Sequence, residues 1–364
     1  MCNSPLHPLL VSLPKCEHHL HLEGCLTPDL LFSLSAKNNI PLPPPSEDPA
    51  FASPSTLAER YTAFTSLDDF LHYYYIGFRV LVTPEDFEAL AWSYFLHAHR
   101  EANVRHAEVF FDPQAHTNRS IPLSTVINGF AAAASRAESE LGMSSLLIPC
   151  LLRHLPIADS HSTYTALVEG EYFTSGVLGG IGLCSTELSQ PPHLWAPIFT
   201  DASSRGIRRT VHAGEEGPPA YVTLALDALD AMRIDHGVRA AEDTHLLTRL
   251  AAEGVLLSLC PVSNAALKVT KSVSDAPVRA LLDHGVRFSV NSDDPAYFGA
   301  WIQDVYCAVQ EAFGLTVGEW AGIVRAAVEG SWCEEERKKV LRGEVDGVLG
   351  NWERRGEDSR EGGD

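Results

Sequence analysis

The stretch KCEHHLHLEG, residues 15–24, begins as a β-rich run and ends in closely spaced histidines. Similar short runs recur along the chain, and stretches with helical periodicity separate most of them. The seven later runs cover residues 104–111, 145–152, 179–184, 207–212, 232–237, 254–260 and 285–290. Eight strands that alternate with helices over about 280 residues predict an α/β fold of the (β/α)8 type, the TIM barrel.

The residues that follow the first run decide between two α/β folds. A doubly wound parallel sheet, the alternative fold, requires a glycine-rich phosphate turn after its first strand. The segment HLEGCLTP (21–28) is not such a turn, so the barrel is favoured. We expect one barrel domain over residues 10–345, with a helical insertion at 25–100 as a cap and a charged, disordered tail at 351–364.

The composition of the 364 residues excludes several classes of function. A formal net charge of −20 disfavours nucleic-acid substrates. No apolar run approaches the length of a membrane span, and the first residues lack the pattern of a signal peptide. The eight cysteines lack close pairing, so we expect reduced thiols in a cytoplasmic protein, with the nucleus as a second location.

Polar side chains lie at the predicted carboxyl ends of four strands, where TIM-barrel enzymes carry their catalytic groups. They are His19 and His21 on the first strand, His212 on the fifth, Asp235 and His236 on the sixth, and Asp293 and Asp294 after the eighth. Because side chains alternate along a strand, His19 and His21 should share a face. His18 should then face the opposite side, toward the helix layer.

These groups include a candidate set of zinc ligands. The imidazoles of His19, His21 and His212 and the carboxylate of Asp293 suit a borderline cation such as Zn²⁺. Such a metal lowers the pKa of bound water to roughly 7. The segment GIGLCSTE (180–187), which ends strand four, has no lysine to bridge two metals, so we expect one zinc ion per chain.

Three neighbouring side chains are candidates for the remaining chemistry. Glu215 follows His212 by three residues and suits general acid–base catalysis. His236, at the next strand end, could orient or deprotonate the water. Asp294 points away from its neighbour Asp293 and could form a hydrogen bond with substrate.

Five motifs resemble the adenosine/adenine deaminase family of the amidohydrolase superfamily. They are PKCEHHLHLEG (14–24), HAGEEG (212–217), IDHG (234–237), CPVSN (260–264) and SDDPAYFG (292–299). The resemblance covers residues 10–340, and EVFFDPQAHT (108–117) is most similar to the adenine deaminase branch. It implies zinc held by His19, His21, His212 and Asp293. It also implies that Glu215 protonates the purine at N1, that His236 stabilises and helps deprotonate the attacking water, and that Asp294 accepts a hydrogen bond from the N7 side.

The reaction implied by this resemblance is the zinc-dependent hydrolytic deamination of adenine to hypoxanthine and ammonia, a step of purine salvage. The partner is then a small-molecule purine, with no nucleic acid and no membrane, and the oligomeric state is left open. Two alternatives remain at this stage. One is a deaminase of adenosine or of an N6-substituted adenine or its nucleotide, and the other is a catalytically impaired relative that binds purines.

Departures from the family pattern affect the substrate. Cys184 stands where the adenine branch usually has an aspartate, which leaves base selectivity open. Glu23 stands where adenosine deaminases have an aspartate near the ribose, and its longer side chain is consistent with a smaller pocket. We expect Ser185 and Glu187 to line the purine edge, while His116 is either a gate of the pocket or a structural histidine.

Overall fold

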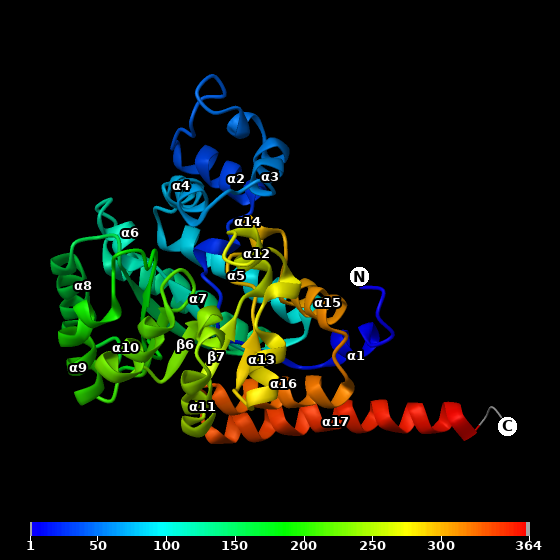
Figure 1. Cartoon of the computed structure of the whole chain (residues 1–364). Coiled ribbons are helices and arrows are strands. Elements are labelled where there is room, and N and C mark those ends of the chain that lie inside the picture. Colours follow the sequence, from blue (N-terminus) through cyan, green and yellow to red (C-terminus); the bar gives the residue numbers. More distant parts are fainter. Residues whose placement is uncertain (1, 362–364) are drawn as a thin grey trace.

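The computed structural model describes residues 2–361 (Figure 1). Eight parallel strands pair in sequence order from β1 to β8. Their bounds are β1 Lys15–Glu17, β2 Val104–Phe111, β3 Ser144–Leu152, β4 Ile181–Cys184, β5 Arg209–Ala213, β6 Arg233–His236, β7 Leu256–Leu259 and β8 Phe288–Val290. Each strand coincides with one of the eight predicted runs, most of them with tighter bounds, so the strand prediction is confirmed.

Helices connect the strands and form the outer layer of the molecule (Figure 1). Their bounds are α1 His7–Ser12, α2 Pro28–Asn38, α3 Pro54–Tyr61, α4 Leu67–Phe78, α5 Pro84–Ala102, α6 Pro113–Thr117, α7 Leu123–Leu141, α8 Ile157–Glu169, α9 Ala196–Ser204, α10 Pro219–Leu229, α11 Thr244–Glu253, α12 Pro261–Ala266, α13 Val278–His284, α14 Pro295–Phe298, α15 Ile302–Phe313, α16 Val317–Gly330 and α17 Glu335–Glu361. Most βα units therefore carry at least one helix, as a barrel of parallel strands requires.

The barrel closes between β1 and β8 just beyond the ends of both strands. Leu20 forms an isolated parallel bridge with Asp293. The His21 N–H donates to the Asp293 carbonyl oxygen at 3.0 Å, and the Asp293 N–H donates to the His19 carbonyl oxygen at 3.1 Å. The predicted (β/α)8 barrel is thus confirmed, and its closure places the β1 histidines beside Asp293.

Side chains fill the interior of the barrel. Glu108 on β2 and Arg233 on β6 form a buried ion pair at 2.5 Å, and the guanidinium lies 4.1 Å from the centre of the Trp332 ring. Burial raises the pKa of the Glu108 carboxyl, but Arg233, His106 and His18 together outweigh burial and hold that pKa below its ordinary value. The barrel is therefore a packed core rather than a channel.

The insertion after β1 forms a lobe above the carboxyl ends of the strands. Helices α2, α3 and α4 make up this lobe, at the top of Figure 1. Tyr61 of α3 stacks on Tyr297 of α14 with ring centres 4.6 Å apart, which fastens the lobe to the barrel. Residues 84–100 of the predicted cap lie in α5, which packs beside α7 because its apolar face, including Phe87 and Leu90, is fully buried.

The C-terminal segment is helical over part of the predicted disordered tail. Helix α17 extends to Glu361, through a segment rich in glutamate and arginine and without proline, which favours a helix. Residues 362–364 of the predicted tail lie outside the described residues. Between residues 2 and 361, no helix has the length and apolar character needed to cross a membrane.

Candidate active site

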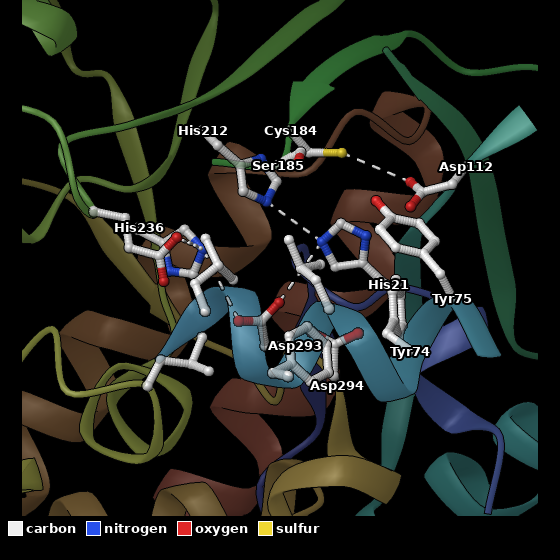
Figure 2. Close-up of a pocket in the computed structure, with 15 residues that line it drawn as sticks. His21, Tyr74, Tyr75, Asp112, Cys184, Ser185, His212, His236, Asp293 and Asp294 are labelled. Carbon is white, nitrogen blue, oxygen red and sulfur yellow. Dashed lines mark hydrogen bonds and ion pairs between the residues drawn. The ribbon is translucent and has the colours of Figure 1, made fainter. Parts of the chain in front are cut away.

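Four buried side chains from three strand ends converge where the barrel closes. Figure 2 shows three of them, His21, His212 and Asp293. The Nε2 atom of His19 lies 3.2 Å from Oδ1 of Asp293, and Nε2 of His21 lies 3.6 Å from the same oxygen. The Nε2 atoms of His21 and His212 are 3.3 Å apart. The structure thus brings together all four side chains that the sequence predicts as zinc ligands.

Three separations between these donor atoms fit a tetrahedral metal ion. Bonds of about 2.0–2.2 Å from zinc to nitrogen or oxygen place neighbouring ligand atoms roughly 3.3–3.6 Å apart. The separations of 3.2, 3.3 and 3.6 Å in the cluster agree with this geometry. Burial lowers the pKa of His21 to about 3, so its imidazole is neutral, which is the form that coordinates a metal.

Asp235 of β6 orients two of these histidines, His212 directly and His19 through Ser258. Its Oδ2 lies 3.2 Å from Nδ1 of His212, and its Oδ1 accepts a hydrogen bond from Ser258 Oγ at 2.9 Å. The Ser258 hydroxyl in turn lies 3.0 Å from Nδ1 of His19. Such partners fix the ring orientation of metal-binding histidines. Asp235 lies at a predicted strand end, but the sequence indicates no role for it; its register opposite His212 on β5 places it on the interior face.

Glu215 and His236 face each other beside the ligand cluster. Oε2 of Glu215 lies 3.5 Å from Nε2 of His236. The Asn264 amide reaches both groups, at 3.1 Å from Glu215 Oε1 and 3.2 Å from His236 Nδ1. Burial, followed by the charge of Asp293, raises the pKa of Glu215 well above its ordinary value. Asn264 lies in the CPVSN motif, but only its tertiary contacts reveal that it orients both groups.

Three strand ends near the cluster adopt left-handed backbone conformations. The φ angles are 74° at Ser185, 63° at His236 and 67° at Asp293. Residues other than glycine rarely adopt this conformation, and such strain concentrates at functional sites. The distorted turns aim these side chains across the mouth of the barrel.

Asp294 lines the cavity at this mouth, next to Asp293. A Cβ atom at Gly24 would lie 2.2 Å from Asp294 Oδ1 and 2.7 Å from Asp294 Cα, so the HLEG turn requires glycine to let Asp294 approach. Helix α4 covers the cavity with its apolar and aromatic side chains (Figure 2). Those that line it are Leu67, Phe70, Leu71, Tyr74 and Tyr75.

Asp112, at the end of β2, forms another wall of the cavity and was not among the predicted site residues. The Cys184 thiol donates to Asp112 Oδ1 at 3.6 Å (Figure 2). The Asp112 backbone N–H donates to Glu23 Oε1 at 3.0 Å, and His116 Nε2 lies 2.9 Å from the same oxygen. Burial, followed by the charge of Glu23, raises the pKa of Asp112 well above its ordinary value. The position of Asp112 at a strand end was the available signal.

Two of the predicted substrate contacts lie away from the cavity. The Glu187 carboxylate accepts backbone N–H bonds from Gly214 at 2.9 Å and Glu215 at 2.8 Å, so it braces the HAGEEG loop. Glu23 is fully buried under Asp112 and His116. Neither residue is among those that line the cavity, whereas Ser185 is.

The prediction that His18 faces the helix layer is wrong. Its imidazole lies 3.1 Å from Ser289 Oγ and 2.8 Å from Ser331 Oγ. Ser289 pairs in register with Ser258, whose hydroxyl contacts Asp235 and His19 inside the barrel, so His18 also points inward. The regular strand ends at Glu17, so side-chain alternation does not extend through residues 18 and 19.

All eight cysteines are free thiols, as the sequence analysis predicts. One of them, Cys260, lies close to the ligand cluster: its sulfur converges with ligand atoms of His19, His236 and Asp293.

Comparisons with known proteins show the family and the fold of the chain. The model of the family described as adenosine deaminase matches residues 14–348. An adenine deaminase of Gibberella zeae is 53% identical over 349 residues, which cover 96% of this chain and 98% of that relative. The crystal structure of an adenine deaminase from Arthrobacter aurescens is 38% identical, with a TM-score of 0.86, and covers 93% of this chain and 99% of that one. An amidohydrolase structure from Burkhoderia ambifaria with bound Zn shares the fold, with a TM-score of 0.85 at 22% identity, and covers 96% of this chain and 95% of that one.

Proposed function

The chain belongs to the adenosine deaminase family and is a hydrolase, and on this premise we propose that it deaminates adenine, by zinc-dependent hydrolysis, to hypoxanthine and ammonia. The observation that carries the proposal is the convergence of Glu215, His236 and the ligand cluster on one covered cavity. Relatives named adenine deaminase, about 50% identical over almost the full chain, support the choice of base.

His19, His21, His212 and Asp293 would hold the zinc ion, with Asp235 and Ser258 behind them. Zinc at this position supplies Lewis acidity that makes a water molecule nucleophilic near neutral pH. A set of three imidazoles and one carboxylate is typical of zinc rather than of the oxygen-seeking cations.

Two residues beside the ligand cluster, His236 and Glu215, are assigned one proton transfer each. His236 is placed to take a proton from the attacking water, and Glu215 is placed to donate one to the purine ring at N1. Attack at C6 destroys the aromaticity of the ring, so protonation at N1 lowers the cost of the transition state. Asn264 contacts both Glu215 and His236 and holds them in position.

Asp294 and the α4 cap define the part of the cavity that binds the base. Asp294 presents a buried carboxylate oxygen, Oδ1, without a hydrogen-bond partner in residues 2–361. This oxygen suits the imidazole edge of a purine. Leu67, Phe70, Leu71, Tyr74 and Tyr75 cover the cavity and favour a free base over a nucleoside or nucleotide, whose sugar would extend toward them.

A substrate panel with ammonia release as the readout tests this proposal. We expect kcat/KM for adenine to exceed the values for adenosine and N6-methyl-AMP by tenfold or more. A tenfold preference for adenosine or for the N6-methylated nucleotide would overturn the choice of substrate. Binding of adenine by the zinc-loaded protein without any ammonia release would instead indicate a catalytically impaired relative.

A cytoplasmic location is also part of the proposal, with the nucleus as a second location. Eight free thiols, seven of them buried, are typical of a reducing compartment. Imaging of the fluorescently tagged chain in its native cell tests this location, and a signal in the secretory pathway would contradict it.

A further inference from the structure

A second cluster of metal-ligating side chains lies outside the active site, where the N-terminal segment meets α15 (Figure 1). The sulfur atoms of Cys2 and Cys307 each lie 3.4 Å from Nδ1 of His7. All three ligand atoms lie within 4.8 Å of one another. Cys2 and Cys307 are each only 8% exposed, whereas His7 is partly exposed, so the cluster is shielded but can be reached by an ion.

We propose that Cys2, His7 and Cys307 bind a second Zn²⁺ ion. Zinc bonds of about 2.3 Å to sulfur and about 2.0–2.1 Å to nitrogen place sulfur and nitrogen roughly 3.5 Å apart in a tetrahedral site. The two separations of 3.4 Å agree with this value. Two thiolates and one imidazole form a softer donor set than that of the active site, and two thiolates neutralise the charge of the ion.

Gln303 adjoins the fourth position of this site. It precedes Cys307 by one helical turn of α15, so both side chains lie on one face of the helix. Its Nε2 lies 3.6 Å from the Cys307 sulfur, while its Oε1 is buried without a hydrogen-bond partner in residues 2–361. A half-turn of the amide presents Oε1 to the ion in place of the N–H group.

The proposed ion would join two segments that are 300 residues apart in the chain. Within residues 2–361, a hydrogen bond also joins these two segments: the Asn3 N–H donates to Glu311 Oε1 at 3.1 Å on the exposed surface. Each thiol loses its proton to solvent as its sulfur binds the ion, so binding requires no oxidant or reductant. The ion therefore stabilises the packing of the N-terminal segment on α15 and takes no part in the deamination.

Metal analysis of the full chain tests the proposal. After equilibration with Zn²⁺ and removal of free metal, we expect about two zinc ions per wild-type chain and about one per chain in the Cys2→Ser/Cys307→Ser variant. Cys333→Ser is the matched control, because Cys333 is a partly buried thiol outside this cluster, and it should retain the wild-type content. Adenine turnover should be unchanged in all three proteins. A wild-type content of about one zinc ion would overturn the proposal.

Absorption by bound Co²⁺ provides a second measurement, which is made on the folded protein. Co²⁺ bound at the second cluster should give a thiolate-to-metal charge-transfer band in the wild type and in Cys333→Ser. The double variant should lack that band, although Cys260 beside the active site is unchanged in all three proteins. A band of equal strength in the double variant, or a disulfide between Cys2 and Cys307 detected by intact mass, would reject the site.

Discussion

The carboxylate of Glu215 and the imidazole of His236 lie 3.5 Å apart, and the amide of Asn264 reaches both of them. Glu215 follows β5, His236 ends β6 and Asn264 lies in α12 after β7. Three consecutive strand ends therefore set the geometry of the two groups that we assign to proton transfer. Because one neutral side chain contacts both groups, its loss should affect catalysis more than binding.

Replacement of Asn264 by alanine tests this arrangement. We expect kcat for adenine to fall by about 10²-fold, because misplaced catalytic groups lose the oriented geometry of the transition state. KM should change by less than about threefold, and the zinc content should stay at the wild-type value. Ser263→Ala is the matched control, because Ser263 is equally buried but has no hydrogen-bond partner for its hydroxyl in residues 2–361. Equal kcat values in the two variants would contradict the role of Asn264.

Glu215→Gln should remove the proton donor and leave the shape of the site intact. We expect kcat to fall by about 10²–10⁴-fold, with adenine binding and zinc content retained. Glu216→Gln is the control, since Glu216 is the adjacent carboxylate but contacts Thr186 and the Glu187 N–H rather than the cavity. Kinetics and equilibrium binding together separate the two effects. If both variants turned over adenine at the wild-type rate, Glu215 would have no part in the mechanism.

The fold and the ligand cluster could be predicted because strand periodicity and strand ends are local properties of the sequence. His212 and Asp293 needed only the rule that catalytic groups follow the strands of a barrel. The prediction for His18 failed because it assumed an unbroken strand, whereas regular pairing in β1 ends at Glu17. A one-residue irregularity of this kind depends on closure against β8, which is not a local property.

Two side chains that support the site could not be predicted for the same reason. Asn264 and Glu187 act through partners on other elements, at separations of 27 to 49 residues. Residue type alone made Glu187 a candidate for the purine edge, but its carboxylate has the shape to accept two consecutive backbone N–H bonds, and it binds the HAGEEG loop instead. Only the folded chain distinguishes these two uses of an acid.

His21→Ala and His18→Leu should have opposite effects. His21→Ala removes a proposed ligand, so we expect loss of zinc from the active site and of adenine turnover. His18→Leu should keep its zinc but lower the free energy of unfolding by about 1–2 kcal/mol, because the Ser289 and Ser331 hydroxyls lose a buried partner. Metal analysis and denaturant titration measure the two quantities. Zinc loss in His18→Leu would place His18 among the ligands.

Asp112→Asn should make the protein more stable, by an amount that depends on pH. Burial and the neighbouring Glu23 raise the pKa of Asp112 in the folded state above its unfolded value, so the folded chain retains a proton that the unfolded chain releases. At low pH Asp112 therefore does not change the free energy of unfolding of the wild type. As pH rises above the unfolded pKa of about 3.9, Asp112 lowers that free energy progressively. Asparagine carries no charge, so the Tm of Asp112→Asn should exceed that of the wild type by more at pH 8 than at pH 5.

The groups that contact Asp112 also affect the Tm difference between Asp112→Asn and the wild type. Glu23 titrates beside it, with a pKa that burial raises to about 7, and the Cys184 thiol donates to it. Cys184→Ala is the control, because it removes the thiol partner and leaves both carboxyls in place. Its Tm difference from the wild type should vary little between pH 5 and pH 8. If the Tm gain of Asp112→Asn were also independent of pH, Asp112 would be ionised in the folded enzyme, and the cavity would offer the base a charged wall in place of a neutral one.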